Sequence, residues 1–319
     1  MQRRIFLGTV GTAVAAPAVW AQSESAAAKI IVPFAPGAGS DAMARFFAEE
    51  LGKAINKRFI VENRAGASGA IGADFVGKSA PDGNTLLFVA SPFTTVAAGN
   101  PQPKYVPTDF APVAIMGMGP LMFAANPSVP GKNLADVIAY AKENPGRLNY
   151  GSAGAGGINH LVVEMLKQQT GTFMVHIPYR GIAPATLDVI GGQLQLITGS
   201  VPALLPYIKD GRLKALAMTS RKRSAVAPDV PGMEELGFKG FDVNNYWGLM
   251  APPKTPLAIT QKLNEEVNKL LLKPSVVARL RQDATEPSPM TTDIISAFMV
   301  ADIAKWRQLI QTANLSVDA

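Results

Sequence analysis

The sequence contains no cysteine and only two histidines among its 319 residues. Without cysteine, the chain can form no disulfide bond, no thiolate zinc site and no cysteine nucleophile. Two histidines are too few for the three-histidine sites of zinc enzymes. These absences leave hydroxyl, amide, carboxylate and backbone groups for a functional site, and we expect no metal and no cofactor.

Charged residues are also scarce, at 17% of the chain, and the formal net charge is +6. The one dense basic run, Arg221-Lys222-Arg223, lacks the interleaved aromatic residues of nucleic-acid-binding surfaces. We interpret it as a solvated loop and expect no nucleic-acid partner. Hydrophobic residues make up 48% of a chain about twice as long as one compact domain, which favours two folded lobes.

Residues 1–21 have the three parts of an export signal. Arg3-Arg4 supplies the charged start, a short apolar run follows, and small residues stand at Val19 and Ala21. The run is too short to cross a bilayer as a stable helix. The arginine pair fits the twin-arginine route, but Sec signals also carry basic residues there, so the route stays open. We expect a soluble mature chain that begins near Gln22 and works in the periplasm.

Beyond Lys29, short apolar runs alternate with amphipathic helical segments, which is the pattern of an α/β fold. Long periodic segments at 256–272 and 291–312 predict two C-terminal helices. Proline and glycine content places the expected crossings between lobes at 126–131 and 237–245. The predicted strands are Ile30–Phe34, Phe59–Glu62, Thr85–Ala90, Val113–Met118, Leu121–Ala125, Leu148–Tyr150, Met174–Ile177, Leu194–Thr198, Lys214–Met218 and Trp247–Ala251.

Two glycine-rich turns each follow a predicted strand and open a predicted helix. The first spans residues 33–41 and the second spans 151–157. Such a turn exposes backbone N–H groups at a helix N-terminus, where the free donors and the helix dipole favour an anion. We predict that the two turns hold opposite ends of one ligand, through Phe34, Gly37, Ala38, Gly39, Ser40, Asp41, Ser152, Gly154, Gly156, Gly157, Asn159 and His160.

Asp41 has two possible roles, because a carboxylate beside an anion-binding turn is electrostatically unfavourable for the anion. It can cap N–H groups of the turn and complement the helix dipole. It can instead accept a hydrogen bond from a ligand amine or a bound water. Both roles stay open from the sequence.

The first turn also matches a dinucleotide-binding pattern. The run Gly37-Ala38-Gly39-Ser40-Asp41-Ala42 follows a strand, and Glu62 ends the next strand, where such folds place a ribose-binding acid. An exported dinucleotide-dependent oxidoreductase that uses the Gly37-Ala38-Gly39 turn is therefore the alternative function. Against it, soluble nicotinamide cofactors are scarce outside the cytoplasm.

A serine hydrolase is not indicated. The nucleophile elbow G-x-S-x-G needs a glycine two residues before the serine, and Tyr150 stands there ahead of Ser152. His160 opens a helix and His176 lies in a predicted strand, so we interpret both as structural or ligand-shell residues rather than general bases.

Many short blocks of the chain, taken in order, resemble the substrate receptors of tripartite tricarboxylate transporters, the periplasmic Bug receptors. The resemblance covers nearly the whole chain after the export signal. The blocks are Pro33-Phe34 with Pro36-Gly37 and Asp41, Val61-Glu62-Asn63-Arg64-Ala65-Gly66, Ile71-Gly72-Ala73, Pro81-Asp82-Gly83-Asn84-Thr85-Leu86-Leu87, Asp109-Phe110-Ala111-Pro112-Val113, Leu148-Asn149-Tyr150-Gly151-Ser152, His160-Leu161, His176-Ile177-Pro178-Tyr179-Arg180-Gly181, Gly191-Gly192-Gln193 and Ala215-Leu216-Ala217.

The resemblance implies a two-lobed α/β receptor similar to type II periplasmic binding proteins. Each lobe is then a mixed sheet flanked by helices, with the ligand cleft between the lobes. Lobe 1 is expected to comprise 22–123 and 244–319, and lobe 2 to comprise 124–243. Such a receptor, expected as a monomer, captures a small organic carboxylate and delivers it to the membrane permease subunits of the transporter, with no covalent chemistry.

The sequence departs from the family pattern at three places around the expected cleft. Gly157 and Ile158 stand where the family commonly has threonine or serine. The loop 91–94 and the segment 244–247 also differ from the usual residues. Aromatic side chains near the cleft favour an aromatic or medium-length carboxylate. From these segments we add three predicted ligand-binding residues, Ser91, Phe93 and Tyr246.

Overall fold

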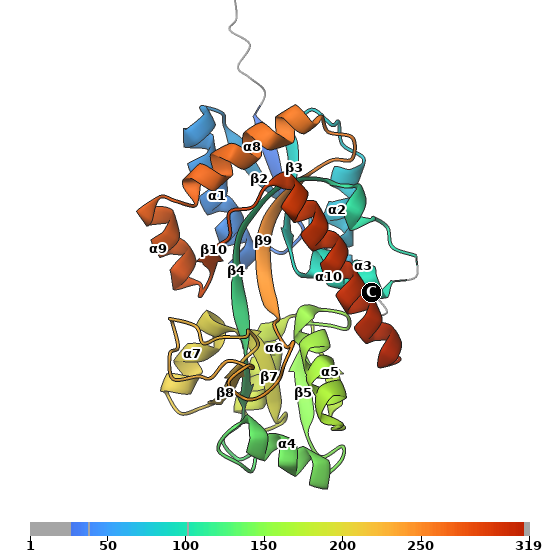
Figure 1. Ribbon diagram of the computed structural model, residues 1–319, viewed down its shortest axis with the longest axis vertical. Helices are drawn as coiled ribbons and strands as arrows, with labels where there is room; N and C mark the ends of the chain where they lie inside the picture. The colour runs from blue at the N-terminus through green and yellow to red at the C-terminus, as the bar shows by residue number, and fades with distance from the viewer. Residues whose placement is uncertain (1–26, 38, 101, 316–319) are drawn as a thin grey trace, which may run out of the picture.

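The computed structural model describes residues 27–37, 39–100 and 102–315. The predicted export signal lies outside the described residues. Figure 1 shows two lobes, one above the other, joined by one long strand that runs from the upper lobe into the lower one. None of the helices in the described part of the chain combines the length and apolar character needed to span a bilayer.

The upper lobe is built on a sheet with the order β2-β1-β3-β9-β4. Strands β1, β2 and β3 are parallel, and β9 is antiparallel to both β3 and β4. A two-residue strand, β10, pairs with the other edge of β4. The bounds are β1 Ala28–Val32, β2 Phe59–Asn63, β3 Thr85–Ala90, β4 Ala111–Ala125, β9 Asn244–Ala251 and β10 Glu286–Pro287.

The lower lobe repeats the same order, as β6-β5-β7-β4-β8. Strands β5, β6 and β7 are parallel, and β4 is antiparallel to its neighbours β7 and β8. The bounds are β5 Asn149–Ser152, β6 Val175–Pro178, β7 Leu196–Ser200 and β8 Lys214–Met218. Strands β1 and β5 therefore occupy equivalent places in the two sheets.

Helices cover both faces of each sheet, as expected where parallel strands are joined by crossover helices. In the upper lobe, α1, α8 and α9 contribute to one apolar cluster, and α2, α3 and the start of α10 contribute to the other. The helices are α1 Gly39–Ile55, α2 Ala70–Gly77, α3 Pro92–Gly99, α4 Leu134–Glu143, α5 Ile158–Thr170, α6 Ile182–Ile190, α7 Val201–Lys209, α8 Leu257–Leu270, α9 Pro274–Gln282 and α10 Thr292–Thr312, with short 3-10 turns at Ala67–Gly69 and Pro107–Asp109.

Strand β4 passes from one sheet to the other without a break. Its residues up to Pro120 pair with β9, and those from Leu121 onward pair with β7. The sequence predicted two separate strands, because Gly119-Pro120 is typical of a turn. The glycine instead allows close packing, since a Cβ there would collide with the carbonyl of Ala284. The first crossing thus lies inside β4 rather than at 126–131.

We call the crossing region around residues 119–121 of β4 and Asn244 of β9 the waist. The register places the carboxyl ends of parallel strands from both lobes there. Ala90, at the end of β3, pairs with a residue of β9 that also pairs with Gly117 of β4, so Ala90 and Gly117 are at the same level. Ser200, at the end of β7, pairs with Leu121 of β4. Four residues of β4 separate these levels, which corresponds to about 13 Å of strand. The loops after these strands therefore lie on opposite sides of the waist.

The last helix, α10, links the two lobes. Its first half contributes Ile295 and Met299 to an upper-lobe cluster. Its second half contributes Trp306, Leu309 and Ile310 to the apolar cluster of the lower lobe. Figure 1 shows α10, in red, descending from the upper lobe beside α3 toward α5. The segment 244–319, which was expected to belong wholly to lobe 1, thus also packs against lobe 2.

Candidate functional site

The two glycine turns follow the equivalent strands β1 and β5, whose carboxyl ends point toward the waist. In open α/β sheets, ligands bind outside the carboxyl ends of the strands. The candidate site is therefore the space between the first glycine turn, residues 33–41, and the second glycine turn, residues 151–157. Ala38 lies outside the described residues.

The carboxylate of Asp41 organises the first glycine turn. Gly37 has a φ of 81°, which favours glycine, and its N–H donates to Asp41 Oδ2 at 3.0 Å. Arg45 Nε donates to the same oxygen at 3.1 Å, and Asn63 Nδ2 donates to Asp41 Oδ1 at 2.9 Å and to the Phe34 carbonyl at 3.1 Å. The side chain thus ties the turn to α1 and β2.

These contacts bear on the two roles considered for Asp41. The residue is 5% exposed, and the Arg45 hydrogen bond, helped by Gly37 and Asn63, lowers the pKa of its carboxyl to about 2. Both oxygens are engaged inside the protein. The geometry favours the capping role over direct acceptance from a ligand amine. It also means that the Gly37 N–H is not free for a ligand, whereas helix geometry leaves the first-turn N–H groups of α1 without intrahelical acceptors.

The second glycine turn is held from beneath by Ser152 and His176. Ser152 Oγ lies 2.6 Å from His176 Nε2 and accepts the Gly154 N–H at 3.1 Å. This serine–histidine contact resembles a nucleophile–base pair. However, Ser152 has no exposed surface, so no substrate reaches it in this conformation. The pair therefore has a structural role in the described state.

The end of the second turn presents free backbone donors. Gly156 has a φ of 73°, and its N–H donates to His160 Nδ1 at 3.1 Å. The N–H groups of Ile158 and Asn159, the first two residues of α5, have no acceptor among the described residues. The Asn159 side chain is already committed to the Thr198 carbonyl at 2.6 Å. The donors available to an anion are thus backbone amides at a helix N-terminus.

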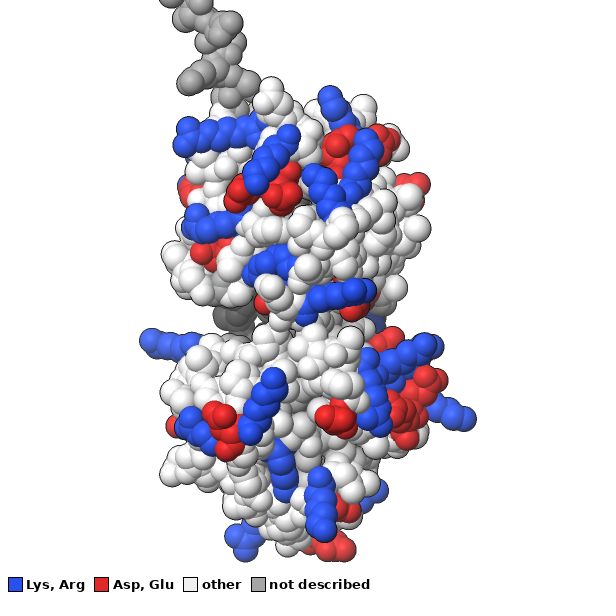
Figure 2. Space-filling view, turned by 90° about the vertical axis from the view of Figure 1, so that its left-hand side faces the viewer, with Lys and Arg blue, Asp and Glu red and all other residues white. Residues whose placement is uncertain are grey.

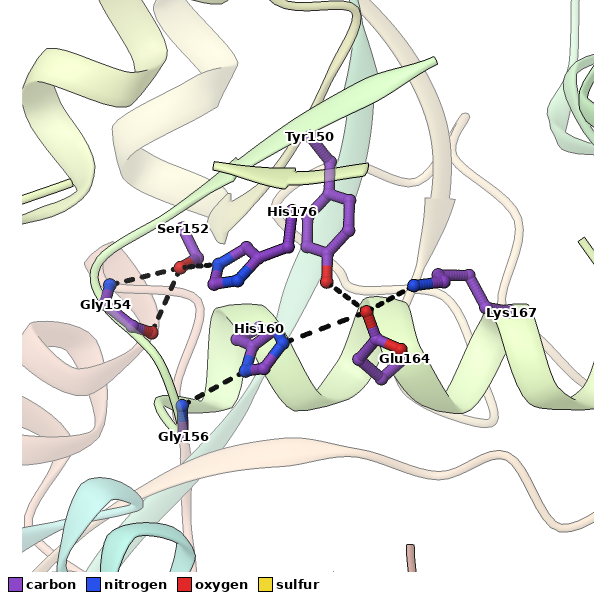
Figure 3. Close-up of polar contacts among 8 residues, drawn as sticks. All are labelled: Tyr150, Ser152, Gly154, Gly156, His160, Glu164, Lys167 and His176. Atoms are coloured by element: carbon purple, nitrogen blue, oxygen red, sulfur yellow. Dashed lines mark hydrogen bonds and ion pairs between the residues drawn. The ribbon is translucent and has the colours of Figure 1, made fainter. Parts of the chain in front are cut away.

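A buried polar network continues from this turn along α5, as Figure 3 shows. The Tyr150 hydroxyl and the Lys167 ammonium both donate to Glu164 Oε1. His160 Nε2 lies 3.8 Å from the same oxygen. Burial and the neighbouring carboxylate raise the pKa of Tyr150 above its ordinary value, so this hydroxyl stays a donor. Glu164 itself is 5% exposed.

The two histidines stack against each other inside this network. Their ring centroids are 3.9 Å apart with an interplanar angle of 13°, and the Tyr150 ring stacks on His176 at 5.0 Å. Burial lowers the pKa of His160 and of His176 to about 4, with smaller contributions from Lys167 at His160 and from His160 at His176. Both rings are therefore neutral at pH 7.

Three predicted residues in the upper lobe lie in its core. Ser91 is 1% exposed, and its Oγ accepts the Tyr246 N–H at 3.3 Å. The Phe93 ring stacks on Tyr105 at 5.2 Å. The Tyr246 ring packs edge-on against Phe298 of α10, at 5.3 Å. We leave these three side chains out of the proposed site.

Glu62, the acid that the dinucleotide alternative would use to bind a ribose, is held by two neighbouring cations. Glu62 forms ion pairs with Lys29 at 3.2 Å and with Arg64 at 2.6 Å, and these partners lower the pKa of its carboxyl. Its oxygens are therefore committed within the protein. Among the residues that the structure describes, no group of three or more His, Asp or Glu side chains is placed to hold a metal ion.

Ser200 is a candidate that the sequence analysis missed. It ends β7 at the waist, is exposed, and precedes α7 without capping it through its side chain. In the strand order, β7 is the equivalent of β3, so Ser200 corresponds to Ser91. A serine followed two residues later by Pro202 is a helix-start signal that could have found it.

The space-filling view shows the molecule narrowing at the waist, with acidic and basic side chains intermingled over both lobes (Figure 2). A groove of about 630 Å³ lies at the waist, beside β4 and β9. It is lined by Met118, Pro120, Ser220, Arg221, Lys222, Arg223, Ser224, Ala225, Asp242, Asn244, Ala284, Glu286 and Ser288. The exposed basic run 221–223 thus lines this groove.

The repeated strand order, the strand β4 that crosses between the lobes and the two glycine turns at the waist define a two-lobed solute-binding protein. The model of the tripartite tricarboxylate transporter family receptors matches residues 43–315. The chain therefore belongs to this receptor family, and the resemblance and fold class expected from the sequence are confirmed.

Relatives cover nearly all of the chain. Protein BugT of Bordetella pertussis is 35% identical over 310 residues, which cover 96% of this chain and 94% of BugT. The structure of Rpa4515 of R. palustris with adipate is 31% identical, with a TM-score of 0.81, and covers 90% of this chain and 97% of that one. MatC from Rhodopseudomonas palustris with bound malate is 28% identical, with a TM-score of 0.78, and covers 89% and 98%.

Proposed function

We propose that this chain is a periplasmic receptor that captures a small organic carboxylate at the waist and delivers it to the membrane permease of a tripartite tricarboxylate transporter. The observation that carries the proposal is that the N–H groups of Ile158 and Asn159, at the start of α5, have no acceptor in the part of the chain that the structure describes. Neutral donors at a helix N-terminus suit a carboxylate. Family membership, and relatives solved with adipate and malate, support the proposal.

The proposed ligand is a medium-length aliphatic dicarboxylate. Aromatic side chains near the waist suggested an aromatic ligand, but Phe93 and Tyr246 pack in the upper-lobe core. The Trp247 ring lies 6.0 Å from Phe88 and is only partly buried, so it and Phe34 are the remaining aromatic candidates. Two glycine turns on opposite sides of the waist suit an extended diacid, with one carboxylate at each turn or bridged to it by water.

We further propose that the chain catalyses no reaction and acts as a monomer. The serine–histidine contact at Ser152 is buried, and Glu62 is held by two cations. An export signal at residues 1–21 accounts for the proposed compartment. The route across the membrane, Sec or twin-arginine, is decided by fusing these residues to a reporter that is active only after one of the two routes.

The ligand proposal is tested by thermal shift of purified protein that begins at Gln22. The panel contains adipate, malate, aromatic dicarboxylates, aspartate and glutamate, with NAD and NADP as controls for the oxidoreductase alternative. A ligand that binds only the folded protein raises the Tm in proportion to the logarithm of its concentration over Kd. We expect a shift with at least one aliphatic dicarboxylate and none with the dinucleotides. Stabilisation by amino acids alone would reopen the ligand-binding role of Asp41.

Replacing Gly156 with valine should weaken binding of the most stabilising carboxylate at least about tenfold. Gly156 has a φ of 73°, where a β-branched residue is strained by about 1–3 kcal/mol. Relief of that strain would move the turn and the N–H groups after it. Titration calorimetry of Gly156→Val against the unmodified protein gives the change in Kd.

Gly211 provides a matched control for this substitution. It has nearly the same φ, 71°, with nothing within 4 Å of the added Cβ, and it follows α7 at the end of the lower lobe away from the waist. Gly211→Val should lower the Tm but leave the Kd unchanged. Equal losses of affinity in the two variants would place the second glycine turn outside the binding site.

A further inference from the structure

Beneath the second glycine turn, the two histidines each direct one ring nitrogen at a polar group of the turn. His160 Nδ1 accepts the Gly156 N–H at 3.1 Å, and His176 Nε2 lies 2.6 Å from Ser152 Oγ. The rings come from α5 and β6 and stack at 3.9 Å (Figure 3). His160 is 4% exposed and Ser152 is fully buried, while His176 is partly buried.

We propose that His160 and His176 are positioning residues, which fix the second glycine turn in the shape that presents the N–H groups of Ile158 and Asn159 to the ligand. That these N–H groups bind a ligand rests on the proposed function. By accepting the Gly156 N–H, His160 turns that amide away from the waist. The hydroxyl of Ser152, held by His176, in turn accepts the Gly154 N–H at 3.1 Å. Each ring thus controls one glycine amide of the turn.

The arrangement requires a neutral His160 and disfavours two charged rings. Only an unprotonated Nδ1 of His160 can accept from Gly156, and two imidazolium rings stacked at 3.9 Å would repel each other. The charged and titratable groups around the pair are Tyr150 on β5 and Glu164 and Lys167 on α5. Lys167 opposes protonation of both rings, while Glu164 favours it at His176.

Acidification should therefore release the turn. The pKa of each ring is lowered from 6.5 to about 4 in the folded protein. The unfolded chain then binds more protons between these values, so the stabilisation from the neutral pair is complete above pH 6.5 and declines as the pH falls toward 4. The protection of the Gly154 and Gly156 amides against hydrogen exchange should decline over the same range.

If the two rings only pack against their neighbours, substitutions should have different effects from those expected of positioning residues. His160→Asn places an amide oxygen at the position of Nδ1, and His176→Gln places an amide group near the position of Nε2. His160→Leu and His176→Leu keep apolar volume and lose the polar atom. Packing alone favours leucine over the smaller asparagine at 160, whereas positioning favours asparagine.

The readout is amide hydrogen exchange by NMR on the folded protein at pH 7, without ligand. Gly156 reports on His160 and Gly154 reports on His176. We expect the protection factor of the reporter amide to stay within about twofold in the amide variants and to fall about tenfold in the leucine variants, the loss of one hydrogen bond. The Tm of each variant is measured alongside, so that global unfolding is separated from release of the turn.

The proposal is overturned if the leucine variants keep the reporter amides protected, or if the amide variants lose as much protection as the leucine variants. Titration of each variant with adipate and with malate gives the second readout. The affinity should be kept in the amide variants and should fall in the leucine variants, in the same order as the protection factors. If neither diacid binds the unmodified protein but the exchange order holds, the positioning role stands and the proposed ligand fails.

Discussion

Replacing Glu164 with alanine should lower the free energy of unfolding by about 3–5 kcal/mol, because it breaks a buried ionic network by removing one partner. Glu164 is 5% exposed and accepts from both Tyr150 and Lys167. Without it, the fully buried Tyr150 hydroxyl has no acceptor and the Lys167 ammonium, whose side chain is only 15% exposed, has no counter-ion. Urea unfolding at pH 7 measures the change.

Two further variants separate the hydrogen bond from the charge. Glu164→Gln keeps an acceptor for Tyr150 and should destabilise less than alanine. Adding Lys167→Met to Glu164→Gln removes the cation that the amide leaves unpaired, so the double variant should recover part of the loss. A double variant less stable than Glu164→Gln alone would show that Lys167 stabilises the fold independently of Glu164.

The glycine turns could be predicted from the sequence because their chemistry is local. Gly37 and Gly156 adopt φ values of 81° and 73°, which glycine tolerates, and each turn lies between a strand and a helix within a few residues. The strand and helix pattern rests on periodicity and is likewise local. That the two glycine turns lie at the carboxyl ends of equivalent strands became clear only from the order of the strands in the two sheets.

The partners inside the site could not be predicted, because they come from distant segments. Asp41 is engaged by Asn63 on another strand, and His160 stacks on His176 across two elements. No local pattern reports such pairing. For the same reason Phe93 and Tyr246 were expected in the cleft: a single sequence shows that an aromatic residue follows a strand, but not which way its ring points.

Chain crossings were also hidden from local patterns. Gly119-Pro120 is typical of a turn, yet both residues lie within β4, where β9 continues the pairing to Asn244. Proline is tolerated there because neither β10 nor β7 pairs with it. Strand β10 ends at the level of Met118, and β7 begins at Leu121. At Gly119-Pro120 the strand thus changes the strand with which it pairs, whereas the direction of the chain stays the same.

The bridging helix α10 gives the last prediction, in which Trp306→Ala lowers the free energy of unfolding by about 3–5 kcal/mol. Trp306 is 1% exposed in the lower-lobe cluster, although the helix begins in the upper lobe.

The Trp306 indole nitrogen has no hydrogen-bond partner in the described part of the chain, so Trp306→Phe removes an unpaired donor while keeping most of the packing. Its loss should stay below about 1.5 kcal/mol. Urea denaturation of the two variants compares them directly. If phenylalanine is as damaging as alanine, the indole N–H makes a stabilising contact that the packing argument lacks, and the link between the lobes depends on that polar contact rather than on apolar burial.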